Sequence, residues 1–137
     1  MATPGKLADF CTGPWGQVIA SELEAHPGFQ ASAAWFDGTI RLAADGRSVT
    51  FRIYRGRVIE VAERNPFGHT FSIAADDATW EAILSSRRNR FVAWAMQDRV
   101  RVEGNVLEYL RVFKAVMALV DVAREWYRQG RSEAGGA

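Results

Sequence analysis

The sequence contains few residues that support covalent or metal chemistry. It has one cysteine, Cys11, and two histidines, so an intramolecular disulfide and a cysteine-rich zinc site are both excluded. It also lacks the glycine-rich phosphate-binding patterns GxxxxGK and GxGxxG. We therefore expect no cofactor, no metal ion and no catalytic residues, because no constellation of side chains typical of an active site is present.

Charge of one sign and long apolar runs are missing as well. Seventeen basic and sixteen acidic residues leave a formal net charge of +1, whereas dedicated nucleic-acid-binding domains carry a clear basic excess. No apolar run reaches the ~18 residues of a membrane-spanning helix, and the N-terminus lacks the apolar stretch of a secretory signal. These absences predict a cytoplasmic protein with no nucleic-acid partner and no transmembrane segment.

Aromatic residues, by contrast, are abundant. The 137 residues include five Trp, eight Phe and three Tyr, and hydrophobic residues make up 48% of the chain. A chain of this length is expected to form one domain, whose core uses part of this apolar surface. Whether the remaining rings face a bound molecule is the question that the composition raises.

Alternation of apolar and polar residues predicts five strands, at 39–43, 48–54, 57–61, 70–74 and 99–103. Asp45-Gly46 and Arg55-Gly56 favour tight turns between the first three strands, which are then antiparallel neighbours. Polar residues on these strands predict that one face of the sheet is in contact with water. The residues that indicate this face are Arg41, Arg52 and Glu60.

Helical spacing of apolar residues predicts a helix from Pro14 to the residues before Pro27, a further piece at 29–34, and two helices after the fourth strand. Asp76 and Asp77 are candidate N-caps for the first of these two, and 89–96 forms the second. The patterned region, 14–128, is the expected domain. Residues 1–13 form a poorly defined N-terminal segment, in which Cys11 has no histidine nearby and is expected to be inert, and residues 129–137 form a flexible tail.

A long helix is expected from Asn105 to about Arg128, and it has two apolar rows instead of one. One row contains Val106, Leu110, Phe113, Met117 and Val120. The other contains Tyr109, Val112, Val116, Leu119, Ala123 and Trp126. One row is expected to pack on the sheet. The second requires a neighbouring helix, a ligand-lined cavity or a partner chain, and the pattern alone does not separate these three alternatives.

The order of these elements, together with the local sequences, resembles the sterol carrier protein type 2 (SCP-2-like) family. The matching segments are Ala34-Trp-Phe-Asp-Gly-Thr-Ile-Arg-Leu42, Arg55-Gly-Arg-Val58, Phe71-Ser-Ile-Ala-Ala-Asp-Asp-Ala-Thr-Trp80 and Val100-Arg-Val-Glu-Gly-Asn105. The resemblance covers residues 14–128. It implies an α+β fold: a five-stranded, antiparallel-rich sheet covered on one face by helices, with a long C-terminal helix. The excess of arginine over lysine, fifteen against two, indicates a bacterial member of the family.

The resemblance also implies a function and a site. The family binds lipids, fatty acyl chains or sterols in an apolar cavity between the sheet and the helices, which implies a non-enzymatic hydrophobic-ligand-binding and carrier protein. By matching position, the cavity floor is formed by Phe51, Ile53, Phe71 and Ile73. Its walls are formed by Trp80, Phe91, Trp94, Met96, Phe113, Met117 and Val120.

Two other functions remain open at this point. The protein is alternatively an accessory subunit that forms a homodimer or docks on a partner enzyme through its apolar helix, or a small enzyme that uses the same cavity. For the enzyme, His69 or a tyrosine is the candidate acid or base, although a structural or surface role is the favoured explanation of His69. Arg87, Arg88 and Arg90 form the one dense basic run, which is either a solvated loop or a contact for an anionic head group.

Overall fold

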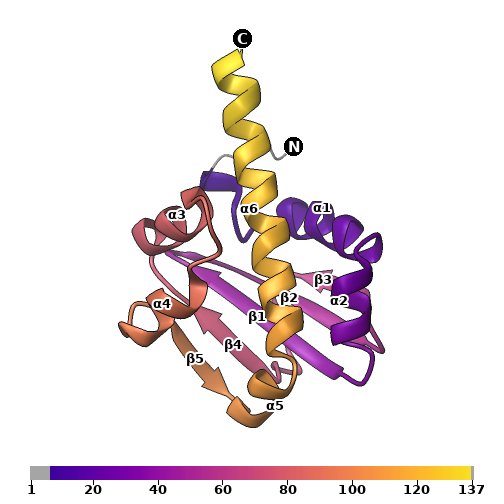
Figure 1. Ribbon diagram of the computed structural model, residues 1–137. Coiled ribbons are helices and arrows are strands. Elements are labelled where there is room, and N and C mark those ends of the chain that lie inside the picture. The colour runs from indigo at the N-terminus through magenta and orange to yellow at the C-terminus, as the bar shows by residue number, and fades with distance from the viewer. Residues whose placement is uncertain (1–6, 137) are drawn as a thin grey trace.

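The computed structural model describes residues 7–136, with the side chains of residues 7–130, and contains a five-stranded sheet (Figure 1). Its strands are β1 (Asp37–Ala44), β2 (Arg47–Tyr54), β3 (Arg57–Ala62), β4 (Phe71–Ala74) and β5 (Arg101–Gly104). Their order is β3-β2-β1-β4-β5. Strands β1 and β4 run parallel, and every other neighbouring pair is antiparallel. The antiparallel-rich sheet predicted from the sequence is confirmed.

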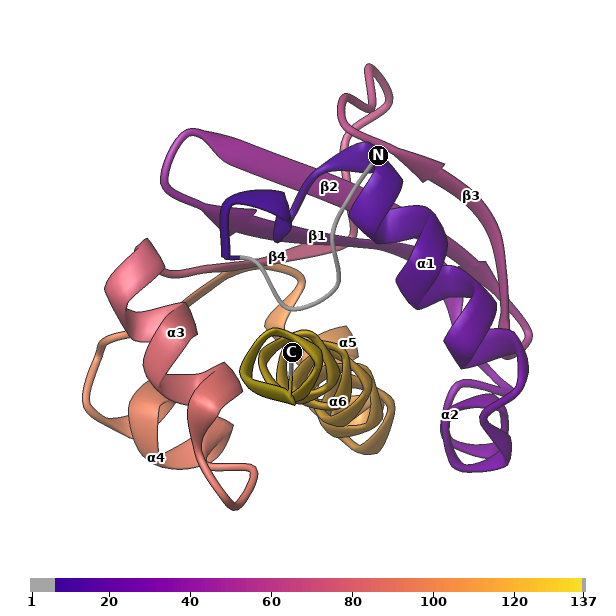
Figure 2. The same cartoon turned by 90° about the horizontal axis from the view of Figure 1, so that it is seen from above.

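Helices cover one face of this sheet, as Figure 2 shows. They are the 3-10 helix η1 (Leu7–Asp9), α1 (Gly13–Glu24), α2 (Pro27–Ser32), α3 (Asp77–Ser85), α4 (Phe91–Met96), α5 (Val106–Arg111) and α6 (Phe113–Gly136). Helix α6 lies in the centre of this layer and packs against α1 and α2 on one side and α3 on the other. None of the helices in residues 7–136 combines the length and the hydropathy that a membrane span requires.

Glycine allows close packing at two positions. In the turn between β2 and β3, Arg55 and Gly56 both have positive φ angles, +50° and +83°, which a type I′ turn requires. A Cβ at Gly56 would lie 2.6 Å from the carbonyl oxygen of Gln30, so this turn sits directly against α2. On α1, a Cβ at Gly16 would lie 2.6 Å from a methyl carbon of Val61, so α1 lies close against the sheet for the same reason.

The expected starts of α3 and α5 are both capped. The Asp76 side chain accepts a hydrogen bond from the Thr79 N–H at 2.8 Å, and Asn105 accepts one from the Glu108 N–H at 3.1 Å. Each bond satisfies a donor that the first helical turn would leave without a partner. Hydrogen bonding with Thr79 favours the charged form of Asp76 and holds the pKa of this carboxyl below its ordinary value.

The C-terminal helix differs from the expectation in two ways. It is interrupted at Val112, where α5 ends and α6 begins, so the single predicted helix is two helices. Helix α6 also extends past Arg128 to Gly136, over the residues expected to form a flexible tail. The row that contains Tyr109 and Trp126 is buried throughout. In the other row, the Val106 side chain is exposed and the Val120 side chain is buried. The two differ because α5 turns away from the helices that pack against α6.

Aromatic rings from distant parts of the chain fill the space between the sheet and α6. The Phe10 ring lies 4.6 Å from Trp15, 4.9 Å from Trp80 and 6.4 Å from Trp126, measured between centroids. Trp15 in turn contacts the Phe51 ring of β2 edge-on at 6.1 Å. Tilted and edge-to-face pairs of this kind are the favourable geometries for aromatic rings. One cluster therefore joins the N-terminal segment, α1, α3, α6 and the sheet.

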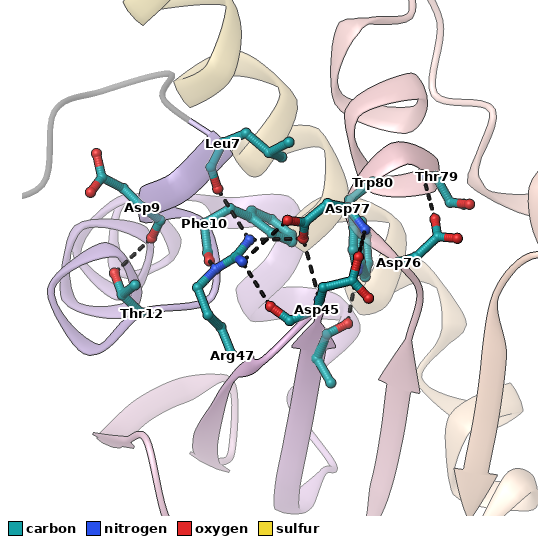
Figure 3. A network of polar contacts seen from close by, with 11 residues as sticks. Leu7, Asp9, Phe10, Thr12, Asp45, Arg47, Asp76, Asp77, Thr79 and Trp80 are labelled. Carbon is teal, nitrogen blue, oxygen red and sulfur yellow. Dashed lines mark hydrogen bonds and ion pairs between the residues drawn. The ribbon is translucent and has the colours of Figure 1, made fainter.

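The N-terminal segment from Leu7 to Thr12 is part of the core, although no sequence pattern predicted a structure for it. Figure 3 shows the contacts of Arg47 on β2 that hold it. The Arg47 guanidinium donates to the carbonyl oxygens of Phe10 at 2.8 Å and Leu7 at 3.2 Å, and to that of Asp45 at 2.9 Å. It also donates to both carboxylate oxygens of Asp77 at 3.0 and 3.3 Å. One side chain thus connects the segment, the β1–β2 turn and the start of α3.

Cys11 is buried within this segment. Its side chain is in the core and its φ angle is +65°, which is uncommon for a residue with a Cβ. Burial raises the pKa of the Cys11 thiol, an effect that the nearby Arg47 only partly opposes. The thiol therefore stays protonated and shielded while the segment is docked, which makes it a reporter of docking.

We predict that Arg47→Gln releases this segment. The substitution leaves the carbonyl oxygens of Leu7 and Phe10 and the Asp77 carboxylate without their charged donor, at a cost of about 2 kcal/mol in the free energy of unfolding. The rate at which a maleimide labels Cys11 under native conditions is expected to rise at least tenfold. Arg64→Gln, at an exposed arginine, is the control and is expected to label at the rate of the unmodified protein. Equal rates in all three proteins would contradict the role assigned to Arg47.

Stability is also expected to depend on Cys11 at alkaline pH. The thiol of the unfolded chain ionises near its ordinary pKa of 9.0, whereas that of the folded chain remains protonated. Its contribution is present below pH 9 and decreases above it, approaching about 1.4 kcal/mol per pH unit. Urea unfolding at pH 8, 9 and 10 measures this, and Cys11→Ala should lose stability more slowly over that range. A parallel decline of the two proteins would refute it.

Candidate functional site

An apolar groove of about 350 Å³ lies between α4 and the α5–α6 junction. Its lining residues are Val92, Ala95 and Met96 from α4, and Tyr109, Leu110 and Phe113 from α5 and α6. Tyr109 supplies the one polar group among these side chains. The volume is at the small end of the ~300–1,000 Å³ range of ligand sites in proteins.

The two short helices beside the groove place large apolar side chains at the surface. Met96 at the end of α4 is 81% exposed, and Leu110 on α5 is 59% exposed. On α5, Val106 and Leu107 precede Leu110 by four and three residues, so all three lie on neighbouring parts of one helix side. Solitary exposed apolar residues are ordinary, but a contiguous group of them indicates an interaction site.

A chain of ring contacts leads from this groove into the core. The Phe113 ring meets the Tyr109 ring edge-on at 5.7 Å, and Tyr109 meets Phe71 of β4 edge-on at 5.6 Å. Phe71 is fully buried on the helix-covered face of the sheet, where Phe36 lies 6.1 Å away. Burial raises the pKa of the Tyr109 hydroxyl above its ordinary value of 10.0, so this group is neutral at physiological pH.

The site residues expected from the sequence fall into three groups. Two of them, Met96 and Phe113, line the groove, and Trp94 and Met117 are partly buried beside the core. The other seven are buried in the core: Phe51, Ile53, Phe71, Ile73, Trp80, Phe91 and Val120. Trp80 illustrates what fills their surroundings, since its ring stacks on Phe91 at 6.5 Å and its indole N–H donates to the Ala43 carbonyl at 2.8 Å.

Four groove residues are absent from the expected site: Val92, Ala95, Tyr109 and Leu110. Tyr109 and Leu110 are both in the apolar rows of the predicted long helix, so their participation in some contact was foreseeable. Their meeting with α4 was not, because it depends on the turn at Val112 that separates α5 from α6. A helical pattern that continues across this position carries no signal for the interruption.

His69 lies apart from the groove. It lines an open cleft of about 630 Å³ together with Arg52 and Glu60, which are on the polar face of the sheet, opposite the helices. This face is the one predicted from the alternation of Arg41, Arg52 and Glu60. Within residues 7–136 no cluster of three or more histidine, cysteine, aspartate or glutamate side chains is arranged to hold a metal ion.

The arginine loop, residues 86–90, connects α3 to α4 and lies next to the groove. Arg87, Arg88 and Arg90 line a shallow depression of about 800 Å³ together with Val92 and Met96. These last two residues also line the apolar groove, so the depression and the groove are continuous. Cationic side chains are therefore adjacent to the apolar site.

No family model matches the sequence, and no curated protein matches it. Solved structures match the fold. The crystal structure of sterol carrier protein 2 has a TM-score of 0.72 and 23% sequence identity, covering 85% of this chain and 98% of its own. A conserved hypothetical protein from Thermus thermophilus, described as a possible sterol carrier protein, has a TM-score of 0.68 and 21% identity, with coverages of 90% and 92%.

A third structure, the ubiquinone synthesis protein UbiJ-SCP2, has a TM-score of 0.59 at 16% identity and covers 86% of this chain and 99% of its own. At these identities the structures are informative about the arrangement of helices and strands. Each is covered over more than nine tenths of its length, so the likeness extends across the domain and is not limited to a motif. The chain therefore has the SCP-2-like fold.

Proposed function

We propose that the protein binds a hydrophobic molecule with a lipid or fatty acyl chain in the groove between α4 and α5, and that it carries this molecule through water. The observation that supports the proposal most directly is the apolar groove itself, at the surface of a domain with the sterol carrier protein fold. Contact with water is unfavourable for a surface groove lined by valine, methionine, leucine and phenylalanine side chains. Covering the groove with an apolar chain removes this contact and stabilises the complex.

Burial of the chain supplies the affinity. Each methylene group removed from water contributes about 0.8 kcal/mol, and immobilising the ligand costs at least about 4 kcal/mol. A chain with about fifteen buried methylenes therefore binds with a free energy near −8 kcal/mol, which corresponds to roughly micromolar affinity. This affinity holds a lipid during transfer and still allows its release.

A chain of this length extends beyond the surface groove. Phe113, Trp94 and Met117 are partly buried side chains that pack against the core next to the groove. Met117 has an unbranched, flexible side chain, which adapts its shape readily to a neighbour. We place the inner end of the ligand between α4 and α6, where these three side chains move aside to admit it.

Binding without chemical conversion is the form of the proposal that the groove favours. Tyr109 is the one titratable residue that lines it, and its raised pKa keeps the hydroxyl protonated, so it is not a general base at neutral pH. His69, the other candidate acid or base, is on the opposite face of the sheet. The Tyr109 hydroxyl instead offers a hydrogen bond to a polar end of the ligand.

The test fills the groove with a side chain. Ala95 lines the groove, so Ala95→Phe occupies the ligand's space without a change in charge. We expect it to weaken the binding of a fluorescent fatty acid at least tenfold. Ala78→Phe, at an exposed alanine of α3, introduces the same ring elsewhere and is expected to leave the affinity unchanged. Circular dichroism and thermal unfolding establish that both variants are folded.

Native mass spectrometry of the freshly purified protein complements this titration. The proposal predicts a lipid-sized mass increment that is present in the unmodified protein and in Ala78→Phe and is reduced in Ala95→Phe. If no lipid co-purifies and the fluorescent fatty acid does not bind, the proposed function is wrong. If Ala95→Phe binds as well as the unmodified protein, the ligand site lies elsewhere.

A further inference from the structure

We propose that the end of the molecule formed by the arginine loop, α4 and α5 docks on the surface of an anionic lipid bilayer. The proposal rests on the proposed function in one respect, because it identifies the bilayer as the place where the hydrophobic ligand is collected or released. The docking also uses surface residues that do not line the groove, namely Leu107 and the three arginines of the loop.

The apolar part of this surface is unusually exposed. Of the ten large hydrophobic residues that are exposed in the described chain, five belong to α4 and α5: Val92, Met96, Val106, Leu107 and Leu110. Leu107, which is 74% exposed, does not line the groove, so ligand binding gives no reason for its exposure. Side chains of this size at a protruding end insert into the boundary between head groups and acyl chains.

The cationic part lies beside it. The side chains of Arg87, Arg88 and Arg90 are exposed, and none of them makes an ion pair with a carboxylate in the part of the chain that the structure describes. They share their depression with Val92 and Met96, so the cationic and apolar parts form one continuous surface. Guanidinium groups bind phosphate oxygens in pairs, which suits the phosphate of a lipid head group.

Positive charge is concentrated in the part of the chain that forms this end. Residues 86–114 include seven basic and three acidic side chains, a net charge of +4, whereas the whole chain has a net charge of +1. The three acidic residues are Asp98, Glu103 and Glu108. Glu108 pairs with Arg111 at 2.8 Å and Glu103 lies 3.9 Å from Arg101, so their charges are partly compensated. The rest of the chain is net acidic and is repelled by an anionic membrane.

This combination favours a bilayer over a second copy of the chain. A second copy would place the arginine loop, or another part of this strongly positive end, near its own counterpart, which like charges oppose. An anionic bilayer matches both parts of the surface. Its head groups bind the arginines, and its acyl chains bury the apolar side chains of α5. Each arginine near such a surface adds to the attraction. The groove then opens toward the bilayer, so a lipid chain enters without crossing water.

The experiment is flotation with vesicles of phosphatidylcholine alone and of phosphatidylcholine with 30% phosphatidylglycerol. We expect the protein to bind the second kind at least tenfold more tightly, and this binding to decrease between 50 and 500 mM salt because the charges are screened. The triple variant Arg87→Gln, Arg88→Gln, Arg90→Gln is expected to lose at least tenfold of the affinity. Leu107→Ser is expected to weaken the affinity for both kinds of vesicle several-fold.

Matched variants on other surfaces control for charge and hydrophobicity. A second triple variant, Arg55→Gln, Arg57→Gln, Arg64→Gln, removes three positive charges near β3. Phe67→Ser removes a ring that is 96% exposed in the loop before β4. Both are expected to bind vesicles like the unmodified protein. If either control loses as much affinity as its counterpart, or if the phosphatidylglycerol vesicles bind no better than the neutral ones, docking through this end is wrong.

Two further measurements distinguish bilayer docking from ligand binding and from dimerisation. Leu107 does not line the groove, so Leu107→Ser is expected to bind the fluorescent fatty acid normally while its flotation decreases, which supports docking as a separate property of this end. In the unmodified protein, normal fatty acid binding without flotation refutes docking and leaves the proposed function standing. Sedimentation of the lipid-free protein detects a dimer, and a dimer that Leu107→Ser disrupts, together with an absence of flotation, would assign this surface to a second copy.

Discussion

The contacts of the Arg47 guanidinium are the constraint on which the rest of the structure depends. Its five N–H groups are directed at three carbonyl oxygens and one carboxylate, contributed by the N-terminal segment, the β1–β2 turn and α3. These segments are up to 70 residues apart in the chain. A partly buried charged group is stable only when its donors are satisfied, so the three segments have to meet in one arrangement. That arrangement places Phe10 among Trp15, Trp80 and Trp126.

The two ends of the helix layer differ in how completely their apolar residues are covered. Near η1 and the start of α3, rings from both layers pack against one another. At α4 and α5 the covering helices have six residues each, and α5 departs from the direction of α6 at Val112. Two short helices do not cover all of their own apolar residues, so a groove and exposed side chains remain there. The proposed ligand site and the proposed docking surface both follow from this incomplete cover.

Local patterns accounted for much of the fold. Alternation located all five strands, and Asp76 and Asn105 located the starts of α3 and α5, because these signals depend on residues within one or two turns of the chain. Two features were not predictable in this way. The burial of Phe10 depends on Arg47, far along the sequence, and the apolar pattern runs through Val112 without a change. For the candidate site, two of the eleven residues implied by the family resemblance, Met96 and Phe113, line the groove.

The amino-acid sequence by itself determined which side chains are apolar, how often they recur and where the backbone turns. These properties specify the strands, the helix starts and the one-sided covering of the sheet, because each is a matter of local geometry and of hiding apolar surface from water. Only the tertiary structure decided which of the sixteen aromatic rings pack against each other and which apolar residues stay at the surface. Phe91 and Met96 belong to the same short helix, yet one is fully buried and the other is exposed. The difference arises because Phe91 packs on Trp80 in the core whereas Met96 lines the groove at the surface, and such contacts join residues that are separated in the sequence.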